Sequence, residues 1–158
     1  MDALLLELFD LVNHPFAVPF ALVVMAPLTE ETIFRGHILR GLLHTTPPAK
    51  AILISAALFS ILHLDPWQMP PTFMVGLALG WVYYRTGSVL LCIAGHALHN
   101  GIVLMFAVHA INTIGTEPTP PFPLWVYLLG ATSLALGLFL VARLTTKPAP
   151  LVPPPLPN

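Results

Sequence analysis

The chain has 158 residues, of which 56% are hydrophobic and 8% are charged, with a formal net charge of −1 at pH 7. An average soluble domain carries about 25% charged residues, so this composition excludes an ordinary soluble protein and indicates an integral membrane protein. The charge balance also argues against a nucleic-acid partner, because phosphates need an excess of cations, and the single cysteine excludes an internal disulfide.

The length allows about five spans of ~20 residues each, which predicts one all-α polytopic membrane helix bundle with a polar catalytic cavity at bilayer depth. Residues 1–13 carry acidic residues among leucines, so we expect an interfacial amphipathic helix. Residues 14–146 should form the bundle. Residues 147–158 are rich in proline and should be a disordered cytoplasmic tail.

The first span is expected from about Phe16 to Arg40, with a kink at Pro27. The stretch Gly41–Lys50 should be a loop, because it is rich in Gly, Thr and Pro. Within the third span, Gly76 and Gly80 have the spacing of a small-residue contact face. The later spans are expected at about Ala49–Leu64, Met74–Tyr84, Val89–Ile111 and Leu124–Leu144, with a turn at Arg85–Ser88 after the third.

The basic residues predict how the bundle is oriented. Successive connections alternate sides, and one side then receives Arg40, Lys50, Arg85, Arg143 and Lys147. Because basic loops stay in the cytoplasm, this side and the C-terminus should be cytoplasmic, in the cell (inner) membrane. Trp67 and Trp125 should lie in the aromatic belt of the outer side.

Several ionisable side chains and an amide interrupt these apolar helices: Glu30, Glu31, Arg35, His63, His96 and Asn100. A charged side chain at bilayer depth costs about 2.5–3.5 kcal/mol, so such groups face a protein interior or a wet cavity and mark function. Carboxylates, imidazoles and an amide in one buried place are the groups that peptide hydrolysis needs.

Helical spacing predicts which of these side chains pair with each other and which point in another direction. Glu31 and Arg35 are four residues apart, so they should form an ion pair on one helix face. Glu30 points about 100° away and stays available as a base. His37 returns to the face of Glu30 two turns on, but we expect it to be an imidazole that faces the interface or a loop. His63 taken alone would more often be a core residue.

The ordered motifs resemble the CPBP family of intramembrane proteases, also called the Abi or CAAX-protease family. Its pattern Glu-Glu-x-x-x-Arg, Phe-x-x-x-His and His-x-x-x-Asn is matched by Glu30–Arg35, Phe59–His63 and His96–Asn100. The stretch Val75–Ser88 is also similar to that family's third helix and the turn after it. The resemblance covers about Val18–Phe106.

This resemblance implies an intramembrane endopeptidase like the type II CAAX prenyl endopeptidases. Glu30, helped by His63, would deprotonate a water molecule, and Glu31 would be held by Arg35. His96 and Asn100 would donate hydrogen bonds to the tetrahedral oxyanion, the interaction that usually contributes most in acyl transfer. The expected catalytic residues are therefore Glu30, Glu31, Arg35, His63, His96 and Asn100.

The family is often called a metalloprotease family, while relatives are described as metal-free glutamate proteases. We expect no cofactor and no metal. The alternative is Zn²⁺ held by Glu30, His63 and His96, since two histidines and a glutamate can leave one open coordination position. The His-Glu-x-x-His helix signature is absent, and Asn100 is a poor zinc ligand.

Other functions remain open from the sequence. The same motifs fit a non-catalytic membrane scaffold or a bacteriocin-immunity protein, and Glu/His pairs also occur in proton-coupled transporters. The expected partners are the lipid bilayer and a peptide or membrane-protein substrate, with or without a lipid. Family members often carry helices ahead of the first motif, where this sequence has only Met1–Asn13, so we also expect missing N-terminal helices, a homo-oligomer or a partner subunit.

Overall fold

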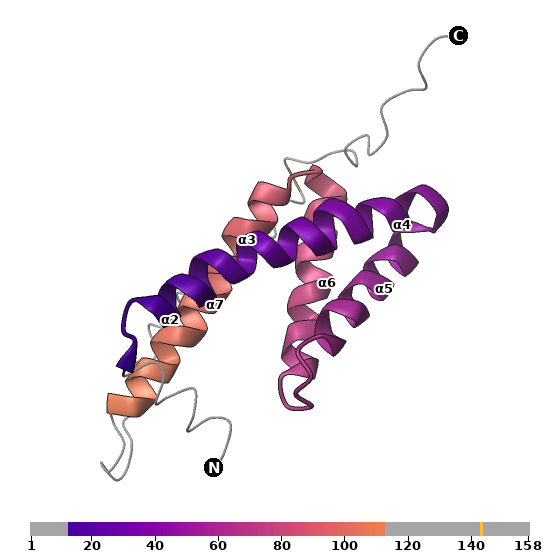
Figure 1. Cartoon of the computed structure of the whole chain (residues 1–158). Coiled ribbons are helices and arrows are strands. Elements are labelled where there is room, and N and C mark those ends of the chain that lie inside the picture. Colours follow the sequence, from indigo (N-terminus) through magenta and orange to yellow (C-terminus); the bar gives the residue numbers. More distant parts are fainter. Residues whose placement is uncertain (1–12, 113–142, 144–158) are drawn as a thin grey trace.

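The computed structural model describes residues 13–112 and Arg143, and within these residues the regular elements are all helices (Figure 1). This confirms the all-α class. The expected interfacial helix, the fifth span apart from Arg143, and the proline-rich tail lie outside the described residues.

The first helix runs without a break over Ala17–Thr45. Its winding changes along its length: α2 (Ala17–Phe20), the π-helical η1 (Ala21–Met25), α3 (Ala26–Glu31), the π-helical η2 (Thr32–Leu39) and α4 (Arg40–Thr45). π-helical turns are rare in proteins, and many of those that do occur lie at functional sites. Here they flank the segment that ends in Glu30 and Glu31. The kink expected at Pro27 stays a prediction.

The remaining helices are α5 (Pro48–Ile61), α6 (Met69–Thr86) and α7 (Val89–Asn112). α5 packs along α6, while α7 runs beside η1 and α3 of the first helix (Figure 1). A small apolar core joins the first helix to the other three through Leu39, Ala51, Tyr83 and Cys92.

The predicted loop Gly41–Lys50 is wrong over most of its length, because α4 continues to Thr45 and α5 begins at Pro48. A single glycine costs a helix only about 1 kcal/mol, so Gly41 does not end it. The break comes at Thr46, whose backbone is extended as expected before a proline, and Pro48 then starts α5.

The third helix begins at Met69, so the predicted stretch Met74–Tyr84 forms most of it, and Pro70 and Pro71 fit the first turn, where proline is tolerated. Its predicted end is confirmed. Gly87 takes the left-handed conformation with φ of 66° and caps α6, and its N–H donates to the carbonyl of Tyr83 at 2.7 Å.

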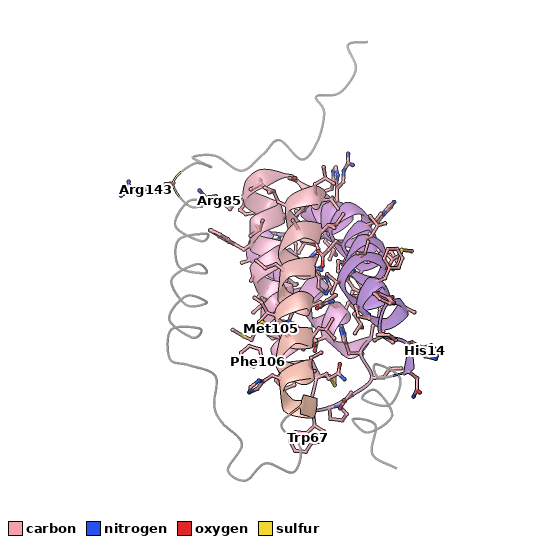
Figure 2. The ribbon with its side chains drawn as sticks, turned by 90° about the vertical axis from the view of Figure 1, so that its left-hand side faces the viewer. His14, Trp67, Arg85, Met105, Phe106 and Arg143 are labelled. Carbon is pink, nitrogen blue, oxygen red and sulfur yellow. The ribbon has the colours of Figure 1, made fainter. Side chains whose placement is uncertain are left out.

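Two helices of the described residues are long and apolar enough to cross a membrane, Ala17–Thr45 and Val89–His109. α5 is apolar but has 14 residues, fewer than the ~20 that a span needs. The count of five spans therefore stays a prediction. Figure 2 shows Arg85 and Arg143 at one end of the protein and Trp67 at the other, while the orientation in a membrane stays a prediction.

The predicted small-residue face of α6 is confirmed by its packing on α5. A Cβ atom added at Gly76 would lie 3.0 Å from the Cα of Ala56, and one added at Gly80 would lie 3.1 Å from the side chain of Ile52. Contacts this short leave no room for a methyl group beside backbone. Gly76 therefore sets how closely α5 and α6 approach.

We predict that Gly76→Ala destabilises the protein by about 1–3 kcal/mol, because the added methyl group must push α5 away from α6. Gly41→Ala is the matched control, since nothing lies within 4 Å of a Cβ at Gly41. Thermal unfolding in detergent measures both variants. Equal melting temperatures for the two would contradict this account of the contact.

Candidate active site

Glu31 lies at the centre of the polar cluster, and its carboxylate is fully buried. The same oxygen, Oε1, accepts a hydrogen bond from Nη1 of Arg35 at 2.8 Å and lies 2.8 Å from Nδ1 of His96. The predicted ion pair between Glu31 and Arg35 is thus confirmed. The contact with His96 was not predicted, because spacing within one helix does not reveal a neighbour on another helix.

Arg35 connects three helices through its buried guanidinium. Nη1 binds Glu31, while Nη2 donates to the carbonyl oxygen of Gly76 on α6 at 3.1 Å. The guanidinium carbon lies 4.8 Å from the centre of the Phe59 ring on α5, a distance typical of a cation–π contact. The planar fork of arginine suits this arrangement, because it can donate in two directions at once.

Phe59 brings both candidate histidines together. Its ring centre lies 5.1 Å from that of His63 and 5.7 Å from that of His96, in edge-to-face contacts. Phe34 makes a third such contact at 5.1 Å. The imidazoles therefore lie around a single aromatic ring, although His63 comes from the turn directly after α5, which ends at Ile61 and not at the expected Leu64, and His96 comes from α7.

A cavity of about 340 Å³ opens beside this cluster. Its lining is mostly apolar, with one carboxylate and one imidazole: Glu30, Ile33, Phe34, Phe59, Leu62 and His63. The side chain of Glu30 is 32% exposed, whereas that of Glu31 is 0% exposed. The expected division between the adjacent carboxylates is therefore confirmed, with Glu31 buried in the ion pair and Glu30 open to the cavity.

Hydrogen-bond partners assign the proton positions of both imidazoles. Nδ1 of His63 lies 3.0 Å from the carbonyl oxygen of Phe59, which can only accept, so Nδ1 carries the hydrogen and Nε2 stays open. Nδ1 of His96 likewise faces the Glu31 carboxylate. Nε2 of His96 then lies toward Glu30, 3.9 Å from its Oε2.

Asn100 lies one turn beyond His96 on α7, and its amide is already engaged. Nδ2 donates to the carbonyl oxygen of Leu22 in η1 at 2.8 Å. His37 does not join the site: it is exposed, and its Nδ1 lies 2.8 Å from the carbonyl of Thr32. The expectation that His37 lies outside the site is thus confirmed.

The zinc alternative can be compared with the geometry. Within residues 13–112 and Arg143, no three His, Cys, Asp or Glu side chains gather as a set that could hold a metal ion. Glu30, His63 and His96 therefore do not form a ligand set here. The metal-free mechanism itself stays a prediction.

Residues 12–102 match the family model described as type II CAAX prenyl endopeptidase Rce1-like. The chain is 30% identical over 99 residues to "Putative membrane peptidase YdiL" of Bacillus subtilis (strain 168), covering 61% of this chain and 41% of that protein. It is 28% identical over 98 residues to "UPF0177 protein YxdF" of Lactococcus lactis subsp. lactis (strain IL1403), covering 61% and 51%. The chain spans about half the length of these curated relatives. No solved structure matches it.

We predict that Arg35→Leu destabilises the protein by about 3–5 kcal/mol, because it leaves the buried carboxylate of Glu31 without its counter-charge. Arg40→Leu is the control: it removes the same charge from an exposed position of the same helix. Unfolding in detergent, followed by circular dichroism, compares the variants. Wild-type stability of Arg35→Leu would refute a structural role for the ion pair.

Proposed function

The chain belongs to the type II CAAX prenyl endopeptidase Rce1-like family, and on this premise we propose that it is an intramembrane endopeptidase that uses a glutamate as its general base. One observation carries the proposal. Glu30 and His63 are the polar members of an otherwise apolar cavity, and Nε2 of His96 lies 3.9 Å from Oε2 of Glu30. A carboxylate in such surroundings is a competent proton acceptor.

In the proposed reaction a water molecule binds between the carboxylate of Glu30 and Nε2 of His63. Glu30 takes one proton of the water while the oxygen attacks the carbonyl carbon of the peptide bond, giving a tetrahedral oxyanion. Glu30 then returns the proton to the leaving amine as the C–N bond breaks. His63 keeps the water in place, since its Nδ1 is committed to the carbonyl of Phe59.

We propose that His96 and Asn100 stabilise the oxyanion. With Nδ1 of His96 bound to Glu31, a hydrogen on Nε2 makes the ring an imidazolium, which the Glu31 carboxylate stabilises. Its Nε2–H can then donate to the oxyanion as negative charge develops. In this scheme Glu31 and Arg35 touch no reacting atom; they hold His96 in orientation and balance its charge.

The substrate is proposed to be a peptide or membrane protein that reaches the site through the bilayer. Ile33, Phe34, Phe59 and Leu62 form most of the cavity lining, which favours apolar side chains next to the cleaved bond. We further expect the end that carries Arg85 to face the cytoplasm, by the positive-inside rule.

Glu30→Gln tests the base directly. Because glutamine keeps the shape but cannot accept the proton, we expect peptide cleavage to fall about 100- to 10,000-fold while the melting temperature stays at the wild-type value. Wild-type and variant protein are reconstituted in membranes with a membrane proteome, and peptides that disappear only with the wild type are identified by mass spectrometry. Identical peptide patterns would indicate a binding protein or scaffold instead.

A chelator distinguishes a general-base mechanism from a metal-dependent one. We expect purified protein to carry no stoichiometric zinc and to keep its activity after dialysis against a strong chelator, whereas Asn100→Ala should cost about 100- to 1,000-fold in turnover by removing a donor. Metal content is measured by mass spectrometry. Loss of activity on chelation that added zinc restores would identify Glu30, His63 and His96 as ligands.

A further inference from the structure

The carbonyl oxygen of Leu22 lacks its usual backbone donor. At the end of η1 the backbone N–H of Ala26 donates to the carbonyl of Ala21, five residues back, as in a π-helix. The next donor in this register is the N–H at position 27, which would bind the carbonyl of Leu22. Position 27 is a buried proline, which has no N–H.

The side chain of Asn100 supplies the missing donor. Its Nδ2 lies 2.8 Å from the carbonyl oxygen of Leu22, and this bond connects α7 to the first helix across 78 positions of sequence. In lipid an unsatisfied carbonyl costs several kcal/mol, and side chains of neighbouring helices commonly satisfy the carbonyls that a proline frees. Leu22 therefore offers a fixed acceptor to the amide of Asn100 only because residue 27 is proline.

We propose that Pro27 is a positioning residue for Asn100. By withholding its N–H it keeps the Leu22 carbonyl open, and that carbonyl binds one amide hydrogen of Asn100. The second amide hydrogen and Oδ1 remain for the reaction. The inference rests on the proposed function, in which this second hydrogen stabilises the oxyanion.

Pro27→Ala should release Asn100. The alanine N–H can donate to the Leu22 carbonyl and compete with the side chain, while helix formation improves, because alanine is the best helix former and proline the worst. We therefore expect a variant that is at least as stable as wild type, with kcat lowered about 10- to 100-fold and KM unchanged, a smaller loss than removing the donor outright.

A double-mutant cycle tests the contact without any need for activity. Asn100→Ala should lower the melting temperature at least twice as much in the wild type as in the Pro27→Ala background, where the alanine N–H already satisfies Leu22. Pro48→Ala is the matched control, since Pro48 is the first residue of α5, where a backbone N–H has no helical partner. It should leave the cost of Asn100→Ala unchanged.

A backbone ester at position 27, introduced with lactic acid, separates the missing N–H from the proline ring. The ester has no N–H and should keep wild-type kcat and wild-type sensitivity to Asn100→Ala. If it behaves like Pro27→Ala, the ring and not the missing donor matters, and the proposal is overturned.

The outcomes also distinguish the two proposals. Equal melting shifts for Asn100→Ala in both backgrounds overturn the positioning role, whatever the activity. Unequal shifts in a protein that cleaves no peptide support the Pro27–Leu22–Asn100 contact and overturn the peptidase assignment instead.

Discussion

The site depends on one buried cation. Arg35 is fully enclosed and binds a carboxylate of its own helix and a backbone carbonyl of α6. A charge without such partners would cost several kcal/mol in this environment, so the helices must meet where both acceptors are within reach. Gly76 contributes to this arrangement in two ways. Its carbonyl accepts the hydrogen bond from Arg35, and its lack of a side chain lets α6 approach α5.

Two adjacent glutamates acquire different chemistry from this arrangement. Glu31 is occupied by Arg35 and His96, which both contact its Oε1, whereas Glu30 lines the cavity. Because Arg35 balances the charge of Glu31, Glu30 is the carboxylate that the proposed reaction can use. This is the general pattern by which equivalent groups in one site take separate roles, set by environment alone.

Contacts within one helix could be predicted from the sequence, as could the close approach at Gly76 and Gly80, but side-chain bonds between helices could not. Helical spacing was sufficient for the pairing of Glu31 with Arg35, and glycine chemistry for the cap at Gly87. The bond between His96 and Glu31 depends on packing, and the π-helical winding of Thr32–Leu39 leaves no signal in residue spacing. The continuation of α4 to Thr45 was missed because tertiary context outweighs the weak helix-breaking effect of Gly41.

Phe59 is 1% exposed and lies between regions of different polarity, with the ion pair of Arg35 on one face and the cavity of Glu30 and His63 beside it. Its buried ring therefore separates the ion pair from the cavity. In the proposed reaction, water would enter the cavity as a reactant, while the ring would keep it from screening the charges that hold the helices together. One aromatic side chain would then allow hydrolysis and a dry structural ion pair within the same bundle.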